Sequence, residues 1–149
     1  MYFSYRGEHL SYLIPVIYTL NSPGTIVYVI SPWINSRVEL TYSWKPNNPR
    51  TTLIDLCISE KKRGIDTIII TSDMSSQEPI SVKSVQEFKN AGFQVTVIQN
   101  LHSKAVIGEY LKYQGSANIT HSGIYRNSEY INILPVLRAQ QEEVRALLS

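Results

Sequence analysis

Short apolar runs alternate along the chain with longer segments of helical spacing. Three runs rich in β-branched residues predict strands, at residues 25–30, 66–71 and 94–99. Helical spacing is found in three segments, at residues 10–20, from Thr51 or Thr52 to about Arg63, and from Ser81 or Ser84 to Gly92. Strands joined by helices of this length are typical of βαβ units and a parallel sheet.

After Asn100 the rhythm changes. Residues 103–107, 112–116 and 129–134 are strand-like and follow one another through short connections, which predicts antiparallel pairs. Residues 136–148 have the pattern of a terminal helix. We therefore expect one α/β domain over residues 1–149, with a mixed, mostly parallel sheet and helices on both faces.

Composition narrows the class of protein. The 149 residues are 43% apolar and 17% charged, which fits a folded domain, and a net charge of +2 permits a polyanionic partner without demanding one. The single cysteine, Cys57, excludes an intramolecular disulfide and a cysteine-based zinc site. The apolar segment 10–20 is too short to span a membrane, so we expect no membrane span and a cytoplasmic location.

Polar residues whose side chains are suited to catalysis or binding are concentrated near the C-terminus. His102 and Lys104 are two residues apart, so on a strand both side chains would project from one face. Glu109 follows with four residues between, and then come the sequences GSAN, with Ser116 and Asn118, and NSE, with Glu129.

The sequences HSKAVIGE, GSAN and NSE together resemble the signature of the phospholipase D superfamily, His-x-Lys-x4-Asp followed by Gly-Ser-x-Asn and Asn-x-Glu. The chain is most similar to the short members with one motif per chain, of the bacterial nuclease type. His-x-Lys alone is a weak signal, whereas the combination is specific. Glu109 stands where the family usually has Asp, and an exposed turn carboxylate beside Gly108 is about as favoured as a role in the site.

Phosphodiester chemistry gives each residue a role. Lys104 supplies a positive charge, Asn118 an amide donor and Ser116 a hydroxyl of lesser weight, all suited to the charge that develops on phosphorus oxygens. His102 can attack phosphorus and form a covalent phosphohistidine. The resemblance implies that Glu129 accepts a hydrogen bond from the other ring nitrogen of His102 and fixes its tautomer.

One motif per chain implies a homodimer. A second imidazole must protonate the leaving oxygen, and the resemblance implies that His102 of another subunit supplies it across a twofold interface. His121 could serve within one chain, but we favour a local hydrogen-bonding role for it; His9 is expected at the surface or at a helix cap. The scheme needs no metal ion and no cofactor.

The partner predicted first is nucleic acid, either DNA or RNA. Trp33 follows a strand end, where α/β sheets bind ligands, and Arg37 and Lys45 in the following loop can contact phosphates. We therefore expect a metal-independent nuclease. The alternatives are a phospholipid head-group hydrolase or transferase with the same catalytic residues, and a nucleic-acid-binding module without turnover.

Overall fold

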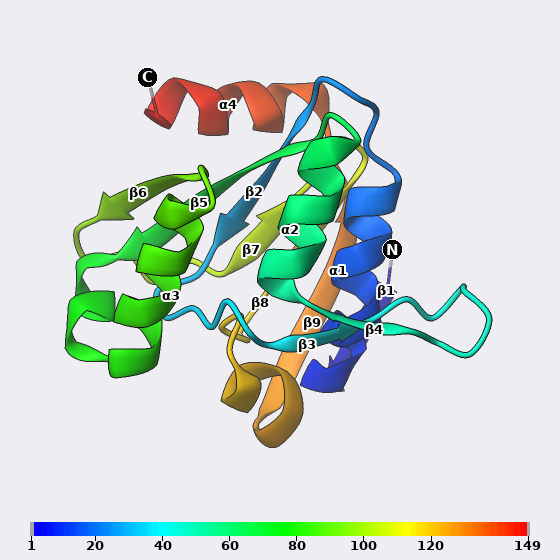
Figure 1. Cartoon of the computed structure of the whole chain (residues 1–149), viewed down its shortest axis with the longest axis horizontal. Helices are drawn as coiled ribbons and strands as arrows, with labels where there is room; N and C mark the ends of the chain where they lie inside the picture. The colour runs from blue at the N-terminus through cyan, green and yellow to red at the C-terminus, as the bar shows by residue number, and fades with distance from the viewer. Residues whose placement is uncertain (1, 149) are drawn as a thin grey trace.

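A seven-stranded sheet with helices on both faces forms the body of the protein (Figure 1). The computed structural model describes residues 2–148. The strands of this sheet are β1 (Tyr2–Arg6), β2 (Ile26–Ile30), β5 (Asp66–Ser72), β6 (Gln94–Ile98), β7 (Ala105–Ile107), β8 (Leu111–Gly115) and β9 (Ser128–Pro135). A separate hairpin consists of β3 (Glu39–Thr41) and β4 (Arg50–Thr52).

The helices are α1 (Leu10–Thr19), α2 (Leu53–Lys62), α3 (Pro79–Asn90) and α4 (Arg138–Leu148). The chain also has three short helical turns, η1 (Gly7–His9), η2 (Asp73–Gln77) and η3 (Ser122–Arg126), the last of which is a π-helix. No helix within residues 2–148 is long and apolar enough to cross a membrane.

The sheet is mixed, with the order β1-β9-β8-β7-β2-β5-β6. The α/β class is confirmed, but the expected excess of parallel pairs is wrong. β2–β5 and β5–β6 are parallel, whereas the pairs β1–β9, β8–β9, β7–β8 and β2–β7 are antiparallel. In the antiparallel half, a short turn joins β7 to β8, a longer connection that contains η3 joins β8 to β9, and β1 adds to the outer edge.

Both faces of the sheet are covered, as the uninterrupted apolar run of β2 predicts. Val27 and Val29 of β2 belong to the main core, which also contains the buried side chains of α1, α2 and α3. Tyr28 points to the opposite face, where Val144 of α4 packs against a smaller cluster. Figure 1 shows α1, α2 and α3 in front of the sheet.

The start of α3 differs from the prediction. The helix begins at Pro79 rather than at Ser81 or Ser84, and Glu78 caps it by accepting hydrogen bonds from the Ile80 and Ser81 backbone N–H groups (3.2 and 2.6 Å). Ser81 and Ser84 are instead buried and bind the loop that follows β2. Their hydroxyls accept from backbone N–H groups at positions 34 and 36 (3.0 and 2.9 Å). The two serines therefore help to position that loop.

Other element ends agree or differ for local reasons. α2 begins after Thr52, whose hydroxyl accepts from the Asp55 N–H (3.3 Å), as predicted. The terminal helix begins at Arg138 rather than at Val136; the Val136 N–H instead donates to the Tyr110 carbonyl (2.8 Å), and its side chain packs against the smaller core. The apolar pattern predicts neither β1 nor the β3–β4 hairpin, since most of their residues are exposed or half-buried.

Candidate active site

Four backbone segments meet where β2 ends. β2 pairs with β7 up to Ile30. Just before β7 begins, the Lys104 carbonyl accepts a hydrogen bond from the Gly115 N–H (3.3 Å). On the next strand pair, the Ser116 N–H donates to the Tyr130 carbonyl (3.1 Å). The loops that follow β2 and β8 and those that precede β7 and β9 therefore lie side by side, and they carry most of the motif residues.

His102 and Lys104 lie just outside β7, in the connection that leads into it. The expectation that both side chains project from one face of a strand is wrong, because β7 begins at Ala105. His102 is exposed and Lys104 is half-buried. The Lys104 ammonium donates to the His102 carbonyl (3.0 Å), which holds the amine close to the histidine backbone. An ammonium has three donors, so further hydrogens stay available for an anion.

Asn118 is held by the loop that follows β2. Its side-chain oxygen accepts from the Trp33 N–H (3.3 Å) and lies 3.4 Å from the hydroxyl oxygen of the buried Ser31. Ser31 itself accepts from the Ile119 N–H (2.9 Å), which ties the two loops together. Because its oxygen is engaged, the amide NH2 of Asn118 is the group that it can offer to a phosphate oxygen.

Ser116 has a structural contact as well as a free donor. Its hydroxyl oxygen accepts from the Tyr130 N–H (2.9 Å), which closes the β8–β9 edge. Gly115 before it is required by close packing, because a Cβ at this position would lie 2.3 Å from the Tyr130 carbonyl oxygen. The close contact explains why the first residue of the GSAN sequence is glycine: any larger residue would clash with the backbone of β9.

Tyr113 supports the same turn from inside the core, and the motif pattern does not identify it. Its hydroxyl accepts from the Ala117 N–H (2.8 Å) and donates to the Ala117 carbonyl (2.9 Å). Burial raises the pKa of the Tyr113 phenol, so the hydroxyl stays protonated and keeps its donor role at ordinary pH. Its position two residues before Gly115, on the buried face of β8, is the one signal of this role in the sequence.

Glu129 borders a cavity of about 270 Å³ together with Trp33, Asn118 and His121. Trp33, which is 44% exposed, lines this cavity, and its contact with a substrate stays a prediction. Among the described residues that line this cavity, His102 is absent and His121 is present. His121 also packs against the Tyr125 ring, with ring centroids 5.3 Å apart. No hydrogen bond between His102 and Glu129 is found within residues 2–148, so the predicted tautomer contact stays a prediction.

Glu109 lies at the opposite end of β7 from His102. Its carboxylate accepts from the Ser22 N–H (3.0 Å), and its own N–H donates to the buried Asn21 side chain (2.9 Å). Both contacts precede β2, whereas His102 is near the end of β2. The structure therefore gives Glu109 a contact that fixes a loop, away from the other motif residues.

The two predicted phosphate contacts in the loop after Trp33 lie outside this cavity. Arg37 pairs with Glu87 on α3 (3.0 Å) and borders a neighbouring hollow, which shares Asn35 and Ile80 with the first. Lys45 lies over the Tyr42 ring at 4.0 Å, in the connection between β3 and β4. Of the two, Arg37 is thus adjacent to the cavity.

A metal centre has no candidate ligands in the described part of the chain. No group of three or more His, Cys, Asp or Glu residues within it is arranged to hold a metal ion. The polar groups that the cavity offers to a ligand are amide, carboxylate, hydroxyl and imidazole groups.

A comparison with protein families decides where the chain belongs. The family model described as "Cardiolipin synthase, PLD-like domain" matches residues 27–145, a range that includes all three motif sequences. The chain belongs to the PLD-like family. The resemblance inferred from the motifs is thereby confirmed.

Solved structures extend the comparison to the fold of this PLD-like chain. It is similar to Nuc from Salmonella typhimurium, a phospholipase D family member, with 18% identity, a TM-score of 0.65, and coverage of 90% of this chain and 82% of Nuc. NucT from Helicobacter pylori matches at 14% identity and a TM-score of 0.57, with 94% and 86% covered. TrmBL2, an archaeal chromatin protein with a novel mode of DNA binding, matches at 10% identity and 0.60, with 99% and 52% covered.

At these identities the structural likeness shows the fold alone. No curated protein sequence matches the PLD-like chain at the significance required. Membership of the family supports phosphodiesterase-type activity as the class of reaction.

Proposed function

We propose that the chain is a nuclease that cleaves nucleic-acid phosphodiesters without a metal ion, through a covalent phosphohistidine at the interface of a homodimer. The observation that carries the proposal is the meeting of the His102–Lys104 segment, Ser116, Asn118 and Glu129 at one end of the sheet. Each of these groups belongs to a motif of the PLD-like family, and together they offer a nucleophile, a cation, neutral donors and a carboxylate.

In the first step, a ring nitrogen of His102 attacks phosphorus and a new N–P bond forms. The bond from phosphorus to the leaving oxygen breaks, and that oxygen takes a proton from a second imidazole. Lys104 and the Asn118 amide stabilise the negative charge on the remaining phosphorus oxygens.

In the second step, water attacks phosphorus and loses a proton to the same second imidazole, which is now neutral. The N–P bond breaks and His102 is regenerated. The products are one strand end that bears a hydroxyl and one that bears a phosphate.

The second imidazole is proposed to be His102 of a second copy. Two observations support this source: His102 is exposed, and a cluster of exposed aromatic side chains lies on β1 and β9, at the edge of the sheet. Phe3, Tyr5 and Tyr130 are 52%, 71% and 45% exposed and pack against one another, with Phe3 stacked on Tyr130 at 6.3 Å. Exposed aromatic patches of this kind mark interaction surfaces, and Tyr130 follows Glu129 directly.

Nucleic acid is favoured over phospholipid as the substrate. The cavity edge carries Trp33, an aromatic surface on which bases can stack. The similar structures support the same choice, since TrmBL2 binds DNA. A catalytically silent binding module is the competing proposal, and the following experiment separates the two.

The test is cleavage of labelled single- and double-stranded DNA and RNA in EDTA, with liposomes assayed in parallel. We expect chelator-resistant cleavage of nucleic acid, an acid-labile adduct on His102, and loss of activity in His102→Ala, Lys104→Ala and Asn118→Ala. Cleavage that stops in EDTA and returns with magnesium would refute the metal-free mechanism. Binding without product, unchanged in His102→Ala, would identify the silent module instead.

The dimer has a separate test. When equal amounts of wild-type and His102→Ala chains exchange subunits freely, about half of the wild-type chains pair with a variant chain. Such a mixed dimer has only one His102, so its active site is incomplete. Activity per wild-type chain should therefore fall to about half. If His121 serves as the second imidazole within one chain, the added variant leaves the activity unchanged.

A further inference from the structure

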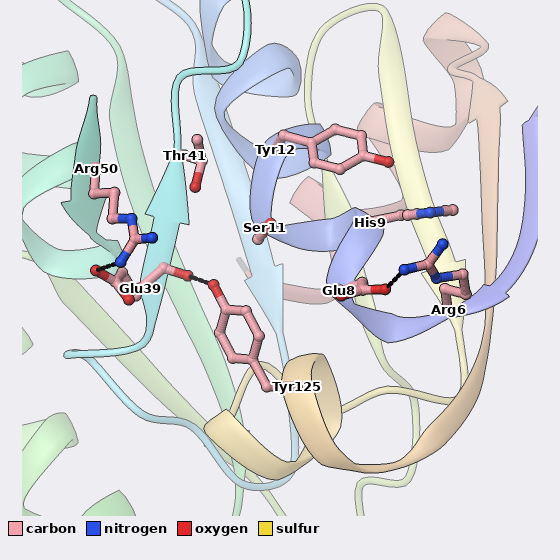
Figure 2. A pocket seen from close by; sticks show the side chains of 9 residues that line it. All are labelled: Arg6, Glu8, His9, Ser11, Tyr12, Glu39, Thr41, Arg50 and Tyr125. Atoms are coloured by element: carbon pink, nitrogen blue, oxygen red, sulfur yellow. Dashed lines mark hydrogen bonds and ion pairs between the residues drawn. The ribbon is translucent and has the colours of Figure 1, made fainter. Parts of the chain in front are cut away.

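A second polar cavity lies on the far side of η3 from the candidate active site. It has a volume of about 400 Å³, within the range of small-ligand sites, and is enclosed by η1 and α1, by the β3–β4 hairpin and by η3 (Figure 2). None of the catalytic roles proposed above uses its residues. Its walls bear charged and aromatic side chains, so it is not a packing defect of the core.

The charges in this cavity are balanced. Arg6 pairs with Glu8 on one wall, and Arg50 pairs with Glu39 on the other (3.3 Å for the second pair). Both guanidinium side chains are about two-thirds or more exposed, at 68% and 71%. Each pair uses one nitrogen of its arginine, so N–H donors remain on both walls, and the exposed carboxylates remain acceptors.

Aromatic rings complete the walls. Tyr12 and His9 lie on one side with ring centroids 5.5 Å apart. Tyr125 rises from η3, and its hydroxyl donates to the Glu39 carbonyl. The cavity thus offers flat rings, hydrogen-bond donors and hydrogen-bond acceptors, and its ion pairs add no net charge. These properties suit a planar, uncharged ligand that itself has donors and acceptors. A nucleobase has these properties, whereas a bare phosphate would meet the two carboxylates.

A third hollow lies between the second cavity and the active-site cavity and shares lining residues with each. This intermediate hollow of about 180 Å³ shares Arg6, Glu8 and Tyr125 with the second cavity and Asn127 with the active-site cavity. Tyr5, which is 71% exposed, also borders this hollow. The three hollows therefore form a track around η3, and Arg6 borders both the intermediate hollow and the second cavity.

We propose that the second cavity binds a nucleobase of the same polynucleotide strand whose scissile phosphate lies beside His102, at the end of the sheet where Asn118 and Glu129 border the active-site cavity. The strand follows the track around η3, with Tyr12 and Tyr125 as stacking surfaces and Arg6 as a contact for the phosphate between the two sites. This inference rests on the proposed nuclease function and adds to it a subsite that selects the base at a flanking position.

The experiment uses single-stranded oligonucleotides in which one base at a time, on either side of the cleaved phosphate, is removed to leave an abasic sugar. We expect one flanking position at which base removal raises KM by about five- to a hundredfold, the contribution of one stacked base, with kcat nearly unchanged. Tyr125→Leu should abolish this dependence, and Tyr125→Phe, which keeps the ring, should retain it.

Arg138→Ala is a matched control for Arg50→Ala. Arg138 is also an exposed arginine paired with a glutamate, but it lies on α4, away from the track. Arg50→Ala should raise KM for the intact oligonucleotide, whereas Arg138→Ala should not.

Binding of the same oligonucleotides to the His102→Ala protein, measured by fluorescence anisotropy, provides a readout that does not depend on turnover. The affinity should fall at the same abasic position. Cleavage and binding that no abasic position weakens, or a dependence that survives in Tyr125→Leu, would overturn the subsite and leave the nuclease proposal intact. A protein that neither cleaves nor binds any oligonucleotide would refute both.

Discussion

Replacement of Ser31 by alanine tests how the fold positions Asn118. The Ser31 side chain is fully buried directly after β2, and its hydroxyl accepts from the Ile119 N–H (2.9 Å) and donates to the Trp33 carbonyl (2.5 Å). It also lies 3.4 Å from the side-chain oxygen of Asn118. Ser31→Ala nearly keeps the size of the side chain but leaves the Ile119 N–H without its partner, next to Asn118 in the same loop.

The expected magnitudes follow from this contact. A buried backbone donor without a partner costs about 1–3 kcal/mol of folding free energy, which lowers Tm by about 2–12 °C for a chain of this size. A displacement of the Asn118 amide by a fraction of an ångström to 1 Å should lower kcat/KM by about ten- to a hundredfold. Urea unfolding and oligonucleotide cleavage at saturating and limiting substrate measure the two effects separately.

Ser36→Ala is the matched control. Ser36 is equally buried in the same loop, but its hydroxyl has no hydrogen-bond partner among the described residues. This substitution should change neither Tm nor activity appreciably. An equal loss of activity in the two serine variants, or equal destabilisation by the two substitutions, would refute a role of Ser31 in holding this loop.

Two further predictions concern carboxylates. Burial acts to raise the pKa of the Glu78 carboxyl, but hydrogen bonds from Ser81 and Ile80 outweigh burial and hold that pKa below its usual value. The cap therefore stabilises the fold at pH values above the pKa that Glu78 has in the unfolded chain. This contribution is lost as pH falls through the lower pKa of the folded chain. Glu78→Ala should therefore cost about 1 kcal/mol in urea unfolding at pH 7 and less at pH 3, and an equal cost at both would contradict the cap assignment. Glu109→Gln should keep kcat/KM within about twofold of wild type, because glutamine can still accept from Ser22 and the site lies at the other end of β7; a tenfold loss at unchanged Tm would show that the carboxylate acts on the site.

The central strands could be predicted because burial on both faces leaves a clear mark in the sequence. β2 and β5 are short runs of β-branched residues, and their ends agree with the prediction to within one residue. The cap of α2 at Thr52 and its termination before Gly64 follow from local rules, and Gly64 adopts a φ of 93°. These features depend on neighbours in sequence, so one chain is enough to find them.

The exposed elements could not be predicted in the same way. β1 joins the sheet edge by pairing with β9, from the other end of the chain, and its residues alternate little in burial. The strand expected at residues 103–107 begins only at Ala105, where its pairing with both Ile30 of β2 and Gln114 of β8 starts. Long-range pairing thus decided where the motif residues lie.

The candidate site shows the same division between local and tertiary information. The types and spacing of His102, Lys104, Asn118 and Glu129 are enough to identify the family, because they lie within 28 consecutive residues of the chain. The residues that hold them, Ser31 and Tyr113 among others, act through hydrogen bonds that depend on the folded chain. A buried serine or tyrosine near a strand end gives little signal of its own, and therefore the sequence identified the motif residues but not the residues that support them.

The sequence identity to Nuc and TrmBL2 is low, at 18% and 10%. The different demands that the core and the end of the sheet make on their residues explain how the fold can be shared at such low identity. The core under the sheet requires apolar side chains of suitable volume, and many combinations meet that requirement. The end of the sheet is more demanding, because Gly115 has no room for a Cβ and the Asn118 oxygen must face the loop after β2. Because the core tolerates many combinations of apolar residues, a chain can keep the fold while the residues at the end of its sheet change. The function of this protein therefore has to be tested at the motif residues and not inferred from the fold.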